Sequence, residues 1–280
     1  QRTSINTFVK TDTFINPLTF HIKRTMEIKS IGGYNEVGKN MTAVKVGDEV
    51  VIFDIGLHIE KVLTYEGEEE IHELTSDKLK KIGAVPDISM LGDWKDKVKA
   101  IVISHCHLDH LGAVPHLAGN FPNAPVIATA YTIEILKSLQ RDNDVKLKNR
   151  LVILSADTKM ELTKDLTLEF VNMTHSTPQT VCSALHTKEG IFIYANDFKL
   201  DNHPTIGKKP NMKRLKELGD KGVKALVLDS LNAEQFKKTP SEKVVREMLN
   251  DVLLGTDNHG HAVIVTTFSS HIARLNSILH

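Results

Sequence analysis

The sequence predicts an α/β protein, and two features of the chain carry that prediction. Short apolar runs of strand length recur between residues 26 and 195, and an amphipathic, helix-like segment spans Tyr131–Leu139. After residue 222 the pattern becomes β-α-β-α, with apolar runs at Val223–Leu228 and Ala262–Val265. A helix follows each run, one beginning at the capping sequence Thr239-Pro240-Ser241-Glu242 and the other capped by Ser269. This alternation predicts a parallel sheet.

The composition is that of a globular protein without a global charge preference. Hydrophobic residues make up 41% of the 280 residues, and 35 Lys and Arg balance 35 Asp and Glu. Any binding to nucleic acid must therefore use a local basic patch. No apolar run has the length of a membrane span, so we expect no membrane association. The two cysteines cannot form a disulfide framework, which favours a reducing cytoplasm.

The first strands lead to an aspartate. Residues 1–25 lack the apolar core of a signal peptide, and we treat them as an extension that is ordered only by docking. Strands are expected at Met26–Ile31, Met41–Val46 and Val50–Ile55, separated by glycine-containing turns. Asp54 lies at the end of the third strand. It is either a capping or turn residue, or an acceptor for the ring N–H of a metal-binding histidine.

A histidine-rich loop follows the apolar strand Val98–Ile103. It reads Ser104-His105-Cys106-His107-Leu108-Asp109-His110 and contains the imidazole and carboxylate groups that bind divalent ions. Alternation along an extended chain points His105, His107 and Asp109 in one direction and Cys106 away from it. Four ligands are too many for one tetrahedral site with an open position. We therefore expect two metals, with His105 and His107 on one and Asp109 and His110 on the other.

Two more candidate ligands stand at strand ends further along the chain. The predicted strand Leu166–Met173 leads to His175, which is the third ligand that the first metal needs. A predicted hairpin, Val181–His186 with Ile191–Ala195, leads to Asp197. A carboxylate has two oxygens, so Asp197 is expected to bridge the two cations.

The His-x-His-x-Asp-His loop resembles the signature of the metallo-β-lactamase superfamily. That resemblance implies an αββα sandwich with the metals at one edge of the two sheets, and usually a hydrolase. The superfamily has an aspartate at the end of an early strand, which favours the acceptor interpretation of Asp54.

Four further stretches resemble the ribonuclease J family in its archaeal form: Gly32–Met41, Ala195–Asp201, Val227–Glu234 and Val265–Arg274. The resemblance implies an inserted β-CASP domain and an RNA substrate cleaved from 5′ to 3′, sometimes with endonuclease cuts. It also implies a homodimer and a preference for 5′-monophosphorylated RNA. Asp229 matches the acidic residue of the first β-CASP motif, although a turn former at a strand end is the other interpretation.

The expected organisation has three parts. Residues 1–25 are the extension, 26–205 the first part of the metallo-β-lactamase domain, and 206–280 an incomplete β-CASP domain. We expect the sequence to be the front part of a longer chain, because two helices have apolar faces without cover. The family also supplies further histidines after its insert, and His271 lies too early to match them.

The expected activity is that of a metal-dependent ribonuclease in RNA decay or maturation. A hydroxide activated by two divalent ions, zinc or alternatively manganese, would attack the scissile phosphorus of single-stranded RNA. Asp54, Asp109 and Asp229 are the candidate catalytic carboxylates. Basic side chains expected to contact RNA phosphates, or else to form a solvated helix, are Lys208, Lys209, Lys213 and Arg214. A second basic stretch, 137–150, is either a solvated surface or an RNA contact. The alternatives are an endonuclease of this family, a small-molecule hydrolase, and a non-catalytic scaffold subunit of an RNA-processing complex.

Overall fold

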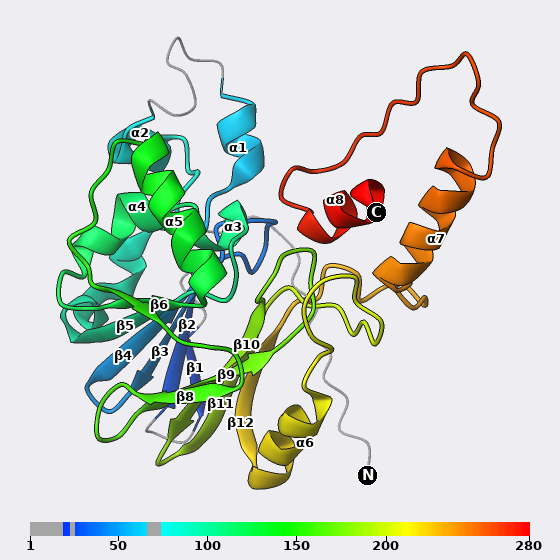
Figure 1. Cartoon of the computed structure of the whole chain (residues 1–280). Helices are drawn as coiled ribbons and strands as arrows, with labels where there is room; N and C mark the ends of the chain where they lie inside the picture. The colour runs from blue at the N-terminus through cyan, green and yellow to red at the C-terminus, as the bar shows by residue number, and fades with distance from the viewer. Residues whose placement is uncertain (1–18, 23–25, 66–73) are drawn as a thin grey trace.

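The computed structural model describes residues 19–22, 26–65 and 74–280. Two β-sheets face each other, and helices cover their outer faces (Figure 1). This is the αββα sandwich that the resemblance implied. The remainder of the segment 1–25, apart from residues 19–22, lies outside the described residues.

Among the described residues, the first sheet has seven strands in sequence order. They are β1 (Thr19–Ile22), β2 (Met26–Gly32), β3 (Met41–Val46), β4 (Glu49–Phe53), β5 (Val98–Val102), β6 (Val126–Ala128) and β7 (Leu151–Ile153). The pairs from β1 to β4 are antiparallel, and those from β4 to β7 are parallel. The expected extension therefore contributes an edge strand, because β1 pairs with β2.

The second sheet, in the part of the chain that the structure describes, has five strands in the order β12-β11-β10-β9-β8. They are β8 (Thr158–Glu161), β9 (Thr167–Asn172), β10 (Val181–Thr187), β11 (Gly190–Ala195) and β12 (Val223–Leu228). The expectation that 223–228 opens a separate parallel sheet was wrong, since β12 pairs in parallel with β11. Helix α6 (Met212–Lys221) makes the crossover and packs Leu215 and Leu218 on the outer face of the second sheet. The strand joins this sheet because the edge of β11 lies next to the end of that crossover.

Several short helices and one longer one cover the first sheet (Figure 1). They are α1 (Ile59–Leu63), α2 (Ser76–Lys81), the 3₁₀ helix η2 (Ile88–Lys97), α3 (Leu108–Leu111), α4 (Val114–Leu117), the 3₁₀ helix η3 (Ala118–Asn120) and α5 (Ala130–Asp142). In α5, Ile133 and Leu136 are buried, which confirms the predicted amphipathic helix. Among the described residues, no helix is long and apolar enough to cross a membrane.

Aromatic side chains fill the space between the sheets just below the candidate site. The ring of Phe53 lies 5.2 Å from that of Phe192 and 5.4 Å from that of Tyr194, and all three are buried. Burying each such side chain contributes about 1.5–3 kcal/mol. This packing fixes the end of β4, and with it the backbone that carries Asp54.

The last part of the chain differs from the predicted β-α-β-α pattern. Helices α7 (Glu242–Leu253) and α8 (Ile272–Leu279) are present, but Ser241 and His271 cap them in place of Thr239 and Ser269. Residues 262–265 form no strand and are exposed. The apolar run finds no neighbouring strand to pair with among the described residues, so composition alone did not make it a strand.

Candidate metal centre

The predicted ligands follow three strands, and Asp54, the predicted acceptor, follows a fourth; the four strand ends meet at one edge of the sandwich. Asp54 follows β4, the histidine loop follows β5, His175 follows β9 and Asp197 follows β11. The strands β4 and β5 are parallel, so their carboxyl ends share an edge. The loop after β5 bonds to the second sheet where β10 begins, through Val181 N and Ser104 O. Residues far apart in sequence thereby come together.

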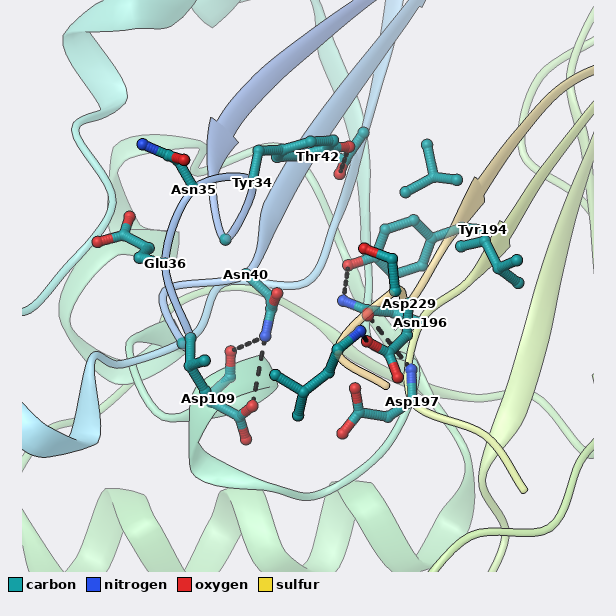
Figure 2. A pocket seen from close by; sticks show the side chains of 18 residues that line it. Tyr34, Asn35, Glu36, Asn40, Thr42, Asp109, Tyr194, Asn196, Asp197 and Asp229 are labelled. Carbon is teal, nitrogen blue, oxygen red and sulfur yellow. Dashed lines mark hydrogen bonds between the residues drawn. The ribbon is translucent and has the colours of Figure 1, made fainter. Parts of the chain in front are cut away.

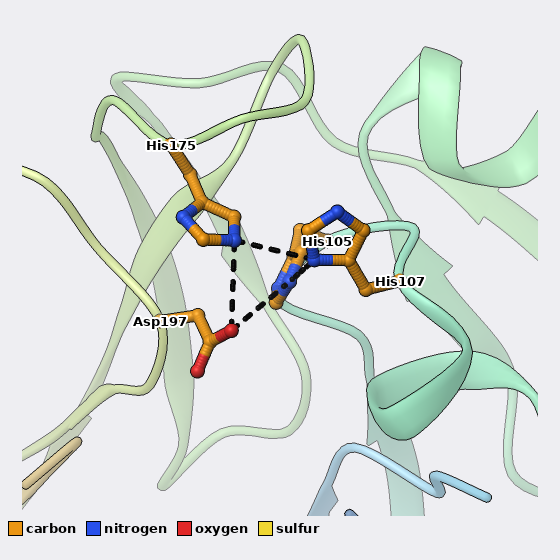
Figure 3. Close-up of side chains that lie close together, drawn as sticks. All are labelled: His105, His107, His175 and Asp197. Atoms are coloured by element: carbon orange, nitrogen blue, oxygen red, sulfur yellow. Dashed lines mark hydrogen bonds and ion pairs between the residues drawn. The ribbon is translucent and has the colours of Figure 1, made fainter. Parts of the chain in front are cut away.

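The first ligand group comprises His105, His107, His175 and Asp197, whose candidate ligand atoms all lie within 4.8 Å of one another (Figure 3). His107 Nδ1 is 3.0 Å from His105 Nε2 and 3.2 Å from His175 Nε2. Two nitrogens on one tetrahedral zinc, each about 2.0–2.1 Å from it, would be roughly 3.3 Å apart. The spacing and chemistry of this donor set fit a divalent cation.

The second ligand group comprises Asp109, His110 and Asp197. His110 Nε2 lies 3.3 Å from Asp109 Oδ2 and 3.6 Å from Asp197 Oδ1. The other oxygen of Asp197, Oδ2, faces His175 at 3.5 Å and His105 at 3.9 Å. Asp197 is therefore shared between the two groups, in the position from which a carboxylate bridges two ions.

Burial and neighbouring charge set the protonation of these groups. Burial lowers the pKa of His175 to about 4 and holds the pKa of His105 well below its ordinary value. Burial works to raise the pKa of Asp197, but the hydrogen bond and charge of His110 outweigh it and bring that pKa to about 2. At neutral pH the first group thus offers neutral imidazoles and an ionised carboxylate, the forms that bind metal.

His110 has the opposite shift. Burial works to lower its pKa, but the charge of Asp54 and hydrogen bonds to Asp109 and Asp197 raise it well above the ordinary value. Three carboxylates thus surround one buried imidazole. Such a concentration of negative charge at a buried edge favours a cation, which supports the fit of the second group to a divalent ion.

Asp54 supports the loop from below. It is fully buried, and its Oδ2 accepts a hydrogen bond from His110 Nδ1 at 2.7 Å. This is the predicted contact with the ring N–H of a candidate ligand. Asp54 also has a backbone φ of 59°, in the left-handed region that Asp tolerates better than most residues. A turn conformation and an acceptor role therefore coexist in the same residue.

Sequence reasoning gave no role to several polar residues that contact the ligands, among them Asn40 and Ser176. Asn40 donates from its backbone N and its Nδ2 to the Asp109 carbonyl, at 3.1 and 3.0 Å (Figure 2). Ser176 Oγ lies 3.1 Å from His107 Nε2, the nitrogen that faces away from the first group. Neither residue has a ligand-type side chain, so only its position in the fold reveals it. Asn40 did lie within one of the stretches that carried the family resemblance.

Two cavities, each of about 400 Å³, flank the ligands. One lies against the loop 32–40 (Figure 2), and the other between His175 and the start of α8. Asp197 and Asp229 line both cavities. Asp229 belongs to neither ligand group, and its Oδ1 accepts a hydrogen bond from Leu231 N, as a turn residue would.

The remaining candidates lie outside the ligand groups. Cys106 is buried and outside both groups, in agreement with the alternation argument, and burial raises the pKa of its thiol to about 11. His271 caps α8 by accepting from Arg274 N.

The predicted basic patch is only partly available. Lys208, Lys209 and Lys213 are exposed. Arg214 is not free for RNA, because its guanidinium pairs with Glu169 through Nε at 2.6 Å and with Glu217 through Nη1 at 2.6 Å. The expectation that Arg214 contacts phosphate is corrected by these ion pairs.

Comparisons with known proteins agree with the fold. Residues 84–209 match the beta-lactamase superfamily domain. A crystal structure of a protein of unknown function from Enterococcus faecalis superposes with a TM-score of 0.63 at 18% identity, over 91% of this chain and 63% of that chain. Residues 84–209, which include the histidine loop, His175 and Asp197, are therefore similar to a beta-lactamase superfamily domain.

The resemblance to archaeal ribonuclease J is also confirmed. The chain is 44% identical to ribonuclease J of Methanocaldococcus jannaschii over 90% of its length, and 42% identical to that of Pyrococcus abyssi over 91%. It spans 56% of the length of each of these two relatives.

Proposed function

We propose that the chain forms part of a metal-dependent ribonuclease that hydrolyses phosphodiester bonds in single-stranded RNA. The observation that carries the proposal is the pair of ligand groups that share Asp197. The sequence similarity to proteins named ribonuclease J supports RNA as the substrate.

The two ligand groups would hold two divalent ions. His105, His107 and His175 would hold the first, Asp109 and His110 the second, and Asp197 both. The imidazole-rich first group favours zinc, and manganese suits the carboxylates of the second. When bound, such ions neutralise phosphate charge and lower the pKa of a bound water molecule.

The protein groups around the ligands do the positioning. Asp54 accepts a hydrogen bond from Nδ1 of His110 and so fixes the imidazole ring. The other ring nitrogen of His110, Nε2, then faces Asp109 and Asp197. Asn40 holds the backbone of Asp109. Asp229 would act at the junction of the two cavities, where an RNA strand that passes from one to the other must cross.

We propose an inserted domain that begins after β12 instead of at residue 206. The support is that β12 is a strand of the second sheet and α6 packs on its outer face, so residues 212–228 belong to the sandwich. The exposed Lys208, Lys209 and Lys213 would contact RNA phosphates along the outer side of that sheet.

The proposed direction of cleavage is from the 5′ end, with a preference for a 5′ monophosphate. The test is a time course with single-stranded RNA labelled at its 5′ end and carrying one or three phosphates there. We expect labelled mononucleotide from the earliest times on the monophosphorylated RNA. Asp109→Ala should not form this product, although its circular dichroism spectrum should match that of the wild type. Early products of intermediate length, insensitive to the 5′ group, would establish endonuclease action. No cleavage of either RNA by the metal-loaded protein would overturn the proposal.

The rival functions predict different results in the same preparation. A scaffold subunit would bind RNA without cleaving it, and the intact ligand groups argue against that outcome. A small-molecule hydrolase would cleave a thioester and leave RNA intact. We also propose a homodimer, which light scattering would test, and a cytoplasmic location, which fits the two free buried cysteines.

A further inference from the structure

The hydroxyl of Ser104 lies between a buried carboxylate and a candidate ligand. Ser104 is 1% exposed, and its Oγ donates to Asp54 Oδ2 at 2.8 Å. The same Oγ is 3.0 Å from His105 Nδ1. An ionised carboxylate only accepts, so the single hydroxyl proton points to Asp54, and Oγ presents a lone pair to His105. His105 therefore carries its proton on Nδ1, and its Nε2 is left to face the first ligand group.

Asp54 also holds the histidine of the second group. Its Oδ2 accepts from His110 Nδ1 at 2.7 Å, while its Oδ1 accepts from Ser104 N at 2.8 Å. Asp54, His105 and His110 are all 0% exposed, so water does not compete for these bonds. One carboxylate thus reaches a histidine in each ligand group, directly in one case and through a hydroxyl in the other.

We propose that Ser104 is a positioning residue that fixes the tautomer and ring orientation of His105, and so makes Asp54 the common support of both ligand groups. This inference rests on the proposed metal centre and not on the choice of RNA as substrate. Loss of the Ser104 hydroxyl should lower the metal affinity of the first ligand group alone. Loss of the Asp54 charge should lower the metal affinity of both ligand groups.

The experiment compares four variants with the wild type in the absence of RNA. They are Ser104→Ala, Ser104→Thr, Asp54→Asn and the matched control Ser183→Ala. Ser183 is also fully buried, but its Oγ has no hydrogen-bond partner among the residues described. Zinc affinity is measured by competition with a chromophoric chelator. The histidine tautomers of the metal-free protein are read from ¹⁵N spectra of the imidazoles, and circular dichroism checks folding.

The expected pattern is specific. Ser104→Ala lowers the affinity for one of the two zinc ions about tenfold or more, the usual effect of losing a hydrogen bond to a ligand. It also moves His105 from the Nδ1–H tautomer to a mixture. Ser104→Thr keeps the wild-type zinc affinity and the Nδ1–H tautomer of His105. Asp54→Asn lowers the affinity for both zinc ions, and Ser183→Ala matches the wild type.

Two results would overturn the inference: unchanged zinc affinity and an unchanged His105 tautomer in Ser104→Ala, or an equal loss at both sites in that variant. If Ser104→Thr does not fold, the tautomer of His105 in Ser104→Ala decides alone. Failure to cleave RNA would reject the proposed function and leave this inference standing, because neither readout involves RNA.

Discussion

Gly56 lies directly against the main chain of Asp109. A Cβ at position 56 would stand 1.6 Å from the Asp109 carbonyl oxygen, far inside van der Waals contact. The same carbonyl accepts hydrogen bonds from Asn40. The backbone of a candidate ligand is thus held between a glycine without a side chain and an asparagine with two donors.

Gly56→Ala should therefore displace the loop that carries Asp109 and His110. Overpacking of a buried contact costs about 1–3 kcal/mol, and the second ligand group should lose metal affinity before the first does. Urea unfolding and a zinc titration measure the two effects. Gly119→Ala is the matched control, because a Cβ built there meets no described residue within 4 Å other than its chain neighbours and its own helix backbone. Equal behaviour of the two variants would contradict the role of this contact.

Removal of a ligand should change the metal content. Metal analysis of the purified protein should give about two ions per chain, and His107→Ala should lower that number, since His107 Nδ1 lies at the centre of the first group. Inductively coupled plasma mass spectrometry after gel filtration measures the content. An unchanged content in His107→Ala would reject the ligand assignment.

The ion pair of the buried Glu169 with the partly buried Arg214 should give a pH-dependent contribution to stability. Burial works to raise the pKa of Glu169, but hydrogen bonds from Arg214 and His186 outweigh it and lower that pKa. As pH falls, the Glu169 carboxylate is therefore protonated at a higher pH in the unfolded chain than in the folded protein. The contribution is fully present above the unfolded pKa of the carboxyl and disappears as pH falls through the lower, folded value.

Glu169→Gln should accordingly cost about 2 kcal/mol of unfolding free energy at pH 7. The difference from wild type should shrink in acid, where the wild-type carboxyl is also protonated. Urea unfolding at pH 7 and at acid pH makes the comparison. The control, Glu217→Gln, removes a partner of the same Arg214 whose side chain is 43% exposed, and it should cost less. A difference that grows in acid would contradict the assignment.

The exposed lysines should contribute to RNA affinity through charge. Replacing Lys208, Lys209 and Lys213 by alanine should reduce the slope of log affinity against log salt by roughly 2, at about 0.7 per lost phosphate contact. Fluorescence anisotropy with labelled single-stranded RNA gives the slope. The control replaces Lys137 and Arg141 of α5 and Lys146 beyond it, which line a common pocket. Helix α5 covers the first sheet, whereas α6 covers the second (Figure 1). If the control variant, and not the Lys208, Lys209 and Lys213 variant, shows the smaller slope of log affinity against log salt, RNA passes over α5.

The sequence alone determined which residues form the candidate centre. The ligands of the histidine loop are neighbours in the chain behind a buried strand, and His175 and Asp197 are ligand-type residues at strand ends. Alternation along a strand and the clustering of strand ends at a sheet edge are local or generic properties. They can be applied without knowledge of the packing, and the structure brought all six predicted ligands together.

The tertiary structure decided which groups support the ligands and which strands are neighbours. Ser104 and Asp54 are 50 positions apart, and Asn40 and Asp109 are 69 apart. No pattern in the sequence indicated that Arg214 was already paired. In the fold its guanidinium forms an ion pair with Glu169, which lies 45 positions away in the chain. The strand β12 completed the second sheet because an open edge of β11 lay beside it. Such pairings depend on which surfaces packing brings into contact, and no local pattern encodes them.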